Sequence, residues 1–178
     1  ALCHYPIFVK PVHLGSSLGV SRVHSLEELR DAMEQVFWYD EIVMLEQGVV
    51  AREMEFALLG NEVILTTNPG EVLTSGEVYS YEGKYINNVK TDTTPYLAPE
   101  ELNEGRNYAL AVYRALGCTG MARVDFFLTE KGWFFNEVNP IPGLTPISLY
   151  PLLWSQAGMT NHQLLDKLVQ LALRRWHQ

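Results

Sequence analysis

The chain has 178 residues, of which 47% are hydrophobic and 19% are charged. This composition is typical of one globular domain or two small ones, and it excludes a disordered chain. The formal net charge of −8 argues against a nucleic-acid backbone as the main partner, and no apolar run is long enough to span a membrane.

The cysteines and the start of the chain bear on the cell compartment. Cys3 and Cys118 alone make neither a disulfide framework nor a metal-binding knuckle, and no export signal is recognisable. We therefore expect two reduced thiols in a cytoplasmic protein. The chain opens at Ala1 without a methionine and enters a strand-like segment at once, so we expect a piece of something longer.

The first third of the chain predicts strands around one helix. An apolar strand is expected over Tyr5–Lys10, followed by a Gly/Ser loop over Pro11–Val20. Ser25 and Glu28 form a capping box, and the apolar spacing after them predicts a helix that ends near Asp40. Further strands are expected over residues 41–46, 53–59 and 63–67.

The remaining chain predicts an irregular segment, helices and a hairpin. Pro69–Pro99 shows little periodicity, and a long irregular stretch of this kind is often a functional lid. A helix should begin with Pro99 as its first residue and end at Gly117. A hairpin of residues 121–128 and 133–139 and a final helix over Asn161–Trp176 complete the chain. Helices and hairpins mix without strict alternation, which favours the α+β class.

The hairpin carries the strongest candidate site. Side chains two residues apart on a strand share a face, so Arg123 lies on the same face as Asp125, and Glu137 on the same face as Asn139. Pairing of the two strands can bring all four side chains to one surface. Carboxylate and amide oxygens suit Mg²⁺ that bridges phosphates, and an arginine suits a developing anion. A plain charged outer face is the alternative, but the rigid loop from Pro140 favours a site. The interleaved neighbours that should face the core are Val124, Phe126, Phe135 and Val138.

Two further clusters lie nearer the N-terminus. Lys10 ends a strand and precedes the small-residue loop Gly15–Gly19, so its ammonium and the loop N–H groups can surround a phosphate. The spacing differs from a Walker A loop, and a plain turn is the alternative. Glu46–Val49 followed by Glu53 can read an adenine edge and a ribose, with solvated glutamates as the alternative.

A fourth cluster lies in the irregular segment. Lys84 can clamp a phosphate and Tyr85 can close over a substrate, whereas an exposed loop is the alternative. In this order, the four clusters resemble the ATP-grasp ligases, and most closely the D-alanine–D-alanine ligase family. The segments that carry the resemblance are FVKPVHLGSSLGVSRV (8–23), MLEQGVVAREMEFALLGN (44–61), YSYEGKYI (79–86), MARVDFFL (121–128) and NEVNPIPGLTPISLYP (136–151).

The resemblance covers essentially the whole chain and implies a partial ATP-grasp fold, an antiparallel sheet with flanking helices. Residues 1–56 would form the C-terminal part of the lid, and residues 57–178 the C-terminal subdomain with the metal and substrate sites. The family's N-terminal domain and the start of its lid have no counterpart in this sequence. We therefore expect poor turnover from this chain alone. Leu14 also departs from the family, because some members carry a glutamate there.

The function that the resemblance implies is ATP-dependent ligation of two D-alanines. The reaction would pass through a D-alanyl phosphate and yield D-alanyl-D-alanine for peptidoglycan precursors. ATP and two Mg²⁺ ions, for which Mn²⁺ can substitute, are the implied cofactors, and a homodimer is open for the full-length protein. Neither nucleic acid nor membrane is an expected partner. The alternatives are D-serine or D-lactate as second substrate, or an inactive nucleotide-binding fragment.

The resemblance also assigns roles to single residues. Arg123 and the N–H group of Gly143 would stabilise the oxyanion, and Ser148 would bind the carboxylate of the second substrate. Ser16 and Tyr85 would belong to the hydrogen-bond set near the first substrate. The implied nucleotide contacts are Lys10, Ser17 and Lys84 to phosphate, Glu46, Gln47 and Val49 to adenine, and Glu53 to ribose. The implied metal ligands are Asp125, Glu137 and Asn139, of which Asn139 also lies at the nucleotide.

Overall fold

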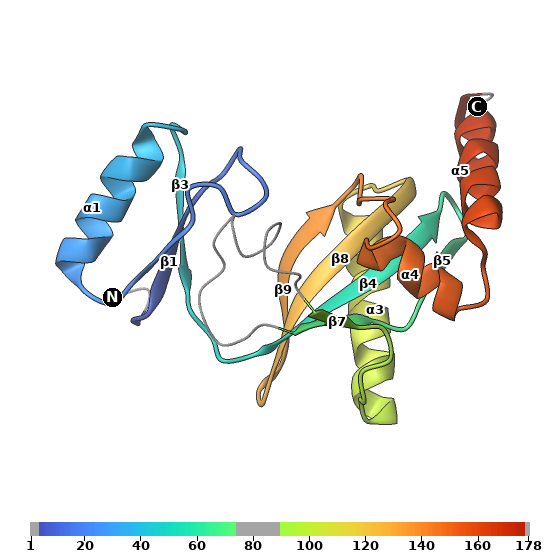
Figure 1. The fold of residues 1–178 in the computed structure, drawn as a ribbon, viewed down its shortest axis with the longest axis horizontal. Helices are drawn as coiled ribbons and strands as arrows, with labels where there is room; N and C mark the ends of the chain where they lie inside the picture. The colour runs from blue at the N-terminus through green and yellow to red at the C-terminus, as the bar shows by residue number, and fades with distance from the viewer. Residues whose placement is uncertain (1–3, 74–89, 177–178) are drawn as a thin grey trace. The chain divides into compact units, whose positions relative to one another are not determined.

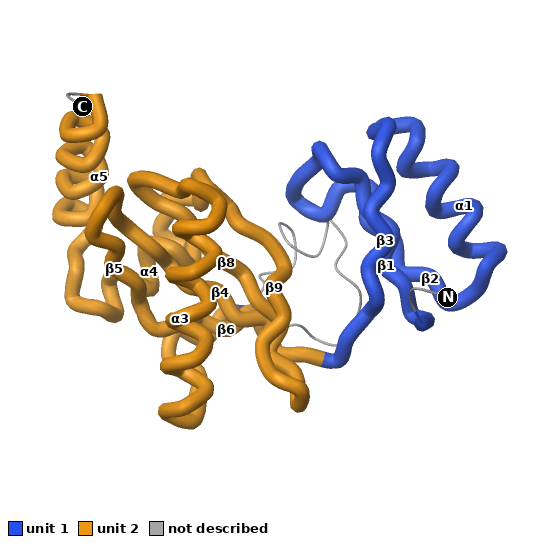
Figure 2. Tube along the Cα trace, turned by 180° about the vertical axis from the view of Figure 1, so that it is seen from behind, with its two compact units in different colours: residues 1–50, 74–90 blue, residues 51–73, 91–178 orange. Residues whose placement is uncertain are grey.

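The chain divides into two compact units. The computed structural model describes residues 4–73 and 90–176 (Figure 1). Within these ranges the first unit holds residues 4–50 and Lys90, and the second holds residues 51–73 and 91–176 (Figure 2). Residues 1–56 are expected to form part of the lid, and residues 57–178 the subdomain with the metal and substrate sites. That assignment stays a prediction.

The first unit is a small antiparallel sheet covered by one helix. Its strands follow the order β2-β1-β3. The Ser25 hydroxyl accepts the N–H of Glu28 at 3.2 Å, and the Glu28 carboxylate accepts the N–H of His24 at 2.7 Å, so the capping box starts the helix as predicted. Ala32 and Val36 pack on the sheet. The elements are β1 (Ile7–Pro11), β2 (Ser21–Val23), α1 (Leu26–Phe37) and β3 (Val43–Gln47).

The second unit is built on a six-stranded sheet of order β7-β6-β4-β8-β9, with β5 also paired to β4. Its strands are β4 (Arg52–Gly60), β5 (Ile64–Thr66), β6 (Gly70–Leu73), β7 (Lys90–Asp92), β8 (Gly120–Thr129) and β9 (Gly132–Asn139). β6 and β7 correct the expectation that Pro69–Pro99 is irregular. β6 gains its ladder from β4, where Val72 lies opposite Glu53, and local periodicity does not reveal such pairing. Residues 74–89 lie outside the described residues.

Three helices pack on this sheet. They are α3 (Pro99–Ala115), α4 (Leu149–Gln156) and α5 (Asn161–Trp176). Pro99 is the first residue of α3, and Gly117 follows its end with a φ of +64°, so the predicted helix limits are confirmed. The α+β class with flanking helices is confirmed as well. Among the described residues, none of the helices combines the length and the apolar content needed to cross a membrane.

The main core lies between the sheet and α3. An aromatic cluster of Phe56, Phe126 and Trp133 has ring centroids 5.6 to 5.9 Å apart. The cluster rests on Gly105 of α3, where a Cβ atom would lie 2.6 Å from the Trp133 ring and 2.8 Å from the Phe56 ring. Gly105 therefore sets how closely the helix approaches the sheet.

The hairpin contains one irregularity. A register shift between Asp125 and Phe126 pairs Phe126 with Phe135, so Asn136 is the extra residue of β9. Val124 and Phe126 are buried and Val138 packs against the core, as expected. Phe135 faces the core as expected, with its ring centroid 6.0 Å from that of Phe126, although 50% of it is exposed. Phe135 shares the face of Phe126 but lies on the edge strand.

We predict that Gly105→Ala destabilises the protein by about 1–3 kcal/mol, because the added methyl group overpacks the aromatic cluster. Alanine itself favours a helix by about 1 kcal/mol, so the sign of the change reports the packing. Urea denaturation measures the effect. The control is Asn103→Ala on the exposed side of the same helix, expected to change stability by less than about 0.5 kcal/mol. A Gly105→Ala protein as stable as the parent would contradict this account.

Candidate functional site

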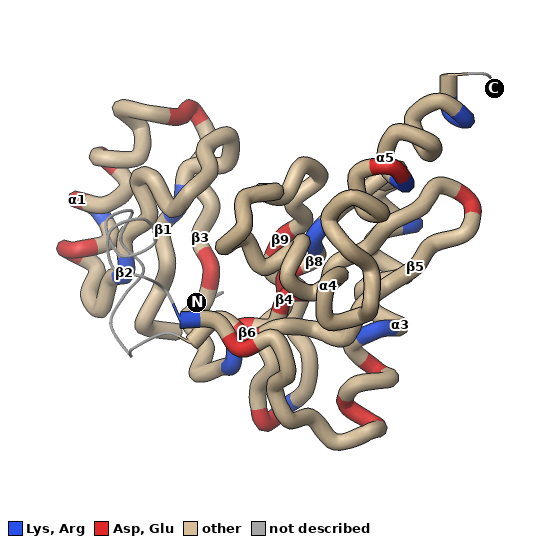
Figure 3. Tube along the Cα trace, turned by 45° about the vertical axis from the view of Figure 1, so that its right-hand side comes forward, with Lys and Arg blue, Asp and Glu red and all other residues tan. Residues whose placement is uncertain are grey.

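The hairpin register brings the four predicted polar residues together. Arg123 lies directly opposite Asn139, and Asp125 lies directly opposite Glu137. Residues opposite each other on paired strands share a face, so all four project to the same side. Acidic and basic segments meet on β4, β8 and β9 in Figure 3. The predicted juxtaposition is therefore confirmed, while the roles of these residues stay proposals.

Arg123 is the centre of a buried ion cluster. Its Nε and Nη2 donate to the two carboxylate oxygens of Asp125, both at 2.8 Å, and its Nε lies 3.1 Å from Glu55 Oε2. The Asp125 side chain is 2% exposed and that of Glu55 is 7% exposed. Burial alone would lower the pKa of Arg123, but the hydrogen bonds to Asp125 and the charges of Asp125, Glu55 and Glu137 raise it. The guanidinium therefore stays charged in a low-dielectric environment.

Glu55 is a member of this cluster that the sequence analysis missed. It lies on β4 directly opposite Asp125 of β8. The sequence did contain a pattern that could have indicated Glu55. Glu53 and Glu55 interrupt an otherwise apolar strand at a spacing of two residues. Carboxylates on such a strand indicate a polar face, and the paired strand decides what they contact.

The expected metal ligands fit a hard cation by chemistry. Asp125, Glu137 and Asn139 present two carboxylates and one amide oxygen from one face of the hairpin. Arg123 occupies one position on each Asp125 oxygen, and each oxygen keeps a further lone pair. Within residues 4–73 and 90–176, no three His, Cys, Asp or Glu side chains form a metal-binding group. A site here therefore depends on the Asn139 amide as its third protein ligand.

The loop after β9 brings Gly143 and Ser148 together. The Ser148 hydroxyl lies 2.8 Å from the Thr145 hydroxyl, and its backbone N–H donates to the Thr145 carbonyl at 3.0 Å. A Cβ atom on Gly143 would lie 2.8 Å from Ser148 Oγ, so only glycine leaves room for this hydroxyl. Ser148 precedes α4 without capping it through its side chain. Its hydroxyl is thus held by Thr145 beside Gly143.

In the first unit, Lys10 of β1 forms an ion pair with Glu46 of β3. Their side chains are 23% and 34% exposed, so both remain accessible to a ligand. The strands that carry them are antiparallel neighbours, with Phe8 opposite Glu46 and Lys10 opposite Met44. The structure therefore brings a predicted phosphate contact and a predicted adenine contact side by side.

The small-residue loop has an unusual backbone. Ser16 and Ser17 have φ angles of +55° and +59°, and the Leu18 N–H donates to the Gly15 carbonyl at 3.1 Å. Two successive positive φ angles across such a bond are typical of a type I′ turn, which favours Asn and Gly rather than serine. Strained backbone of this kind often occurs at ligand-binding positions.

Asp40 anchors this loop at its base and was predicted only as a helix end. Its carboxylate accepts the backbone N–H of His13 at 2.6 Å and that of Ile42 at 3.0 Å, and it lies 3.0 Å from the His13 ring nitrogen. These hydrogen bonds, the His13 backbone bond first, hold the pKa of Asp40 well below its usual range. The chain entering the loop is therefore fixed to the end of α1.

The remaining predicted contacts are divided between the units. Gln47 ends β3 opposite Ile7, and Val49 follows it with 41% exposure. Glu53 belongs to β4 of the second unit, between Val72 and Phe127 in register. Gln47 and Val49 thus belong to the first unit, and Glu53 belongs to the second. Lys84 and Tyr85 lie outside the described residues.

We predict that Arg123→Gln destabilises the second unit by about 3–5 kcal/mol at neutral pH, because it leaves Asp125 and Glu55 buried without their cation. Urea denaturation measures the loss. The control is Arg174→Gln, which removes an exposed arginine of α5 and should change stability by less than about 0.5 kcal/mol. If both variants lose the same small amount, the ion cluster does not depend on Arg123.

Comparisons with known proteins agree with this geometry. A D-alanine–D-alanine ligase from Enterococcus faecalis is 47% identical over 174 residues, which cover 97% of this chain and 50% of the relative. A solved D-Ala:D-Ser ligase from the same species has a TM-score of 0.86 and 36% identity, over 94% of this chain and 50% of that chain. A D-alanine–D-alanine ligase from Bacillus anthracis, solved with ATP, has a TM-score of 0.77 and 26% identity, over 96% of this chain and 51% of that chain.

These likenesses confirm the partial ATP-grasp fold that the sequence predicts. The chain spans about half the length of the curated relatives it matches. The family model described as D-ala D-ala ligase C-terminus matches residues 1–170. Because that match covers nearly the whole sequence, the chain belongs to the D-alanine–D-alanine ligase C-terminus family.

Proposed function

We propose that this chain supplies the nucleotide and metal machinery for ATP-dependent ligation of two D-alanines to D-alanyl-D-alanine. The observation that carries the proposal is the hairpin face, where a buried Arg123–Asp125 pair lies opposite Asn139 and Glu137. Charge neutralisation and alignment are what phosphoryl transfer requires from a protein. Family membership and the ATP-bound structural relative support the same reaction.

The reaction has two steps whose charge changes match these residues. A carboxylate oxygen of the first D-alanine attacks the γ-phosphorus of ATP, ADP leaves, and an acyl phosphate forms. The amine of the second D-alanine then attacks the acyl carbon, loses a proton, and expels phosphate as the amide forms. We propose that Arg123 and the Gly143 N–H stabilise the negative oxygen that develops on the acyl carbon.

We assign the nucleotide contacts that the family resemblance implies, taking each unit by itself. In the first unit, Lys10 and the Ser17 loop would hold phosphates, while Glu46 and the backbone of Gln47 and Val49 would hold adenine. Glu53 of the second unit would hold the ribose, and Lys84 would add a phosphate contact. The positive φ angles of Ser16 and Ser17 support a loop whose N–H groups face an anion.

The proposed metal ligands are Asp125, Glu137 and Asn139, as set out above. Mg²⁺, when bound, supplies positive charge that screens the phosphate oxygens from the attacking carboxylate. This chain's own contribution is to hold three oxygen ligands on one face of the hairpin, with Arg123 hydrogen-bonded to both Asp125 oxygens. We propose two ions and the possibility of exchange with Mn²⁺, since both metals prefer oxygen ligands.

The second substrate is the point at which related ligases differ. The Ser148 hydroxyl, held by Thr145 beside Gly143, is the proposed contact to its carboxylate, and Ser16 with Tyr85 would contact the first substrate. The 47% identical relative is named for D-alanine, whereas the structural relative named for D-serine is 36% identical. D-alanine is therefore the proposed second substrate. A cytoplasmic location stays a prediction that rests on the two expected reduced thiols and on the lack of a recognisable export signal.

The proposal is tested first by nucleotide binding and then by ligation. Calorimetric titration of the chain with Mg·ADP, with and without excess EDTA, should show binding that EDTA weakens. Ligation is tested by replacing the matching half of the Enterococcus faecalis relative with this chain and measuring ADP release with D-alanine. Release that requires D-serine as second substrate would favour the alternative specificity. Metal-independent binding, or none in either protein, would contradict the proposal.

We predict that Glu137→Gln weakens Mg·ADP binding by about tenfold or more while leaving metal-free ADP binding unchanged, because it removes one metal-binding charge with little change of shape. Calorimetry in the presence and absence of Mg²⁺ separates the two effects. Glu130→Gln, at the exposed turn of the same hairpin, is the matched control and should bind as the parent does. Unchanged Mg·ADP affinity in Glu137→Gln would remove this residue from the metal site.

We predict that Lys10→Ala weakens ATP binding by about tenfold or more and adenosine binding by less than about twofold, because a charge-assisted phosphate contact is lost. Competition titrations with both ligands measure the difference. Lys131→Ala removes an exposed lysine at the hairpin turn and serves as the control. Equal losses for ATP and adenosine would show that Lys10 acts through Glu46 or through the fold rather than on phosphate.

A further inference from the structure

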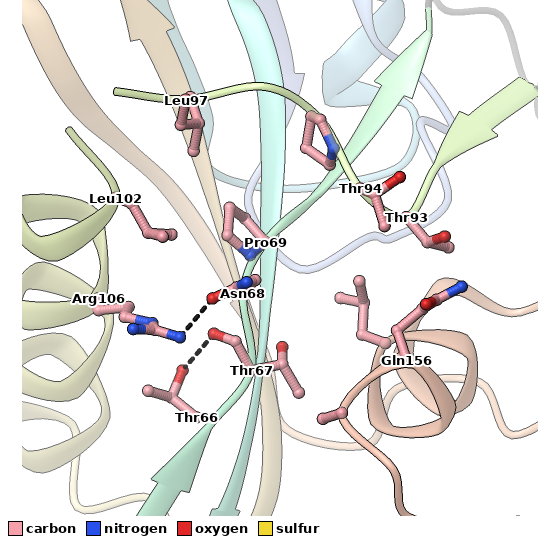
Figure 4. A pocket seen from close by; sticks show the side chains of 13 residues that line it. Thr66, Thr67, Asn68, Pro69, Thr93, Thr94, Leu97, Leu102, Arg106 and Gln156 are labelled. Atoms are coloured by element: carbon pink, nitrogen blue, oxygen red, sulfur yellow. Dashed lines mark hydrogen bonds between the residues drawn. The ribbon is translucent and has the colours of Figure 1, made fainter. Parts of the chain in front are cut away.

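A cavity of about 370 Å³ lies at one edge of the second unit, away from the hairpin face. Its walls come from the β5–β6 connection, the β7–α3 connection, the first turns of α3 and the end of α4 (Figure 4). No residue that lines it is among the residues proposed to bind nucleotide, metal or D-alanine. The volume lies at the lower end of the range for small-molecule sites.

Among the described residues that line this cavity, Arg106 of α3 is the only one with a charged side chain. It reaches from the helix towards Asn68, whose side-chain oxygen accepts a hydrogen bond from Nη2 (Figure 4). Its Nε is buried and has no acceptor in the described structure. Among the described residues, no carboxylate forms an ion pair with Arg106. A guanidinium has five donors, so most of them lack a protein acceptor.

Arg106, of which only Nε is fully buried, differs from Arg123 in its partners. Arg123 is satisfied by two carboxylates, whereas Arg106 has one neutral amide oxygen. A cation that is partly removed from water without a counter-charge costs free energy, and an anion would remove that cost. A planar guanidinium matches the two oxygens of a carboxylate or phosphate. The cavity is thus electrostatically suited to an oxyanion.

The rest of the cavity wall adds an apolar surface. Leu97, Leu102 and Leu153 line it beside the polar groups at Arg106 and Asn68. The β7–α3 connection is held in place by Arg52, whose Nη1 donates to the Tyr96 carbonyl at 3.1 Å while Nε and Nη2 bind Glu71. Arg52 of β4 therefore holds the β7–α3 connection, and with it this part of the cavity wall, in place. A ligand would meet both a guanidinium and apolar side chains within one small space.

We propose that this cavity binds a small organic anion whose carboxylate or phosphate contacts Arg106 and whose apolar body packs on the three leucines. The site is separate from the proposed nucleotide site and does not rest on the proposed function. Its ligand class follows from a guanidinium without a carboxylate partner, a lining whose described residues include no acidic side chain, and the three leucines.

The test uses benzoate as probe and benzyl alcohol as its neutral counterpart. NMR titration of the full chain should show benzoate shifting the methyl signals of Leu102 and Leu153, with benzyl alcohol binding at least about tenfold more weakly because it lacks the charge-assisted contact. Arg106→Gln should reduce benzoate affinity about tenfold or more. Arg114→Gln, an exposed arginine on the same helix, removes the same charge and should leave affinity unchanged.

A second variant guards against misfolding. Asn68→Asp places a carboxylate on Arg106 with almost no change of shape, so it should abolish benzoate binding while Mg·ADP binding stays as in the parent. Inorganic phosphate with the same dependence on Arg106 would identify the oxyanion alone as the recognised group. The proposal is overturned if benzoate and phosphate do not bind at millimolar concentration. It is also overturned if both anions bind Arg106→Gln as tightly as the parent.

Discussion

The Arg123 ion cluster constrains how the second unit can be built. One guanidinium pairs with Asp125 on its own strand and with Glu55 on the neighbouring strand, and all three groups are largely out of water. Removing the guanidinium leaves both carboxylates buried without a counter-charge, which is among the most destabilising changes a domain can undergo. The register between β4 and β8 is therefore fixed, because a slip of one residue would turn these side chains to the opposite face.

The same two strands build the apolar core on their other side. Phe56 and Phe126 alternate with Glu55 and Asp125, and they pack with Trp133 against Gly105 of α3. The apolar face of the sheet thus stabilises the unit through burial. The opposite face carries charged side chains, whose burial by itself would not stabilise the unit. β9 adds its polar residues to the charged face through a single bulge. Fold and candidate site are consequently two faces of one sheet.

Sequence reasoning reached the parts of this arrangement that follow from local pattern. Alternation was enough to bring Arg123, Asp125, Glu137 and Asn139 to one surface, and capping signals located the starts of α1 and α3. It could not find Glu55 as a partner of Arg123, because strand pairing between β4 and β8 is a long-range contact. Asp40 was likewise known only as a helix end, since its partner His13 lies 27 residues earlier in the chain. β6 and β7 depend on tertiary pairing, and the bulge at Asn136 is invisible to strict alternation.

Ser16 and Ser17, in the loop before β2, cost conformational free energy that the sequence alone does not reveal. Ser16 and Ser17 adopt a backbone region in which glycine would be unstrained, and each such residue is disfavoured by about 1 kcal/mol or more. Glycine would relieve that strain, although it would also enlarge the conformational freedom of the unfolded chain. Serine contributes only a hydroxyl that glycine lacks. A loop that retains two serines here exchanges intrinsic stability for hydrogen-bonding groups in fixed positions, as expected where activity rather than folding selects the residue.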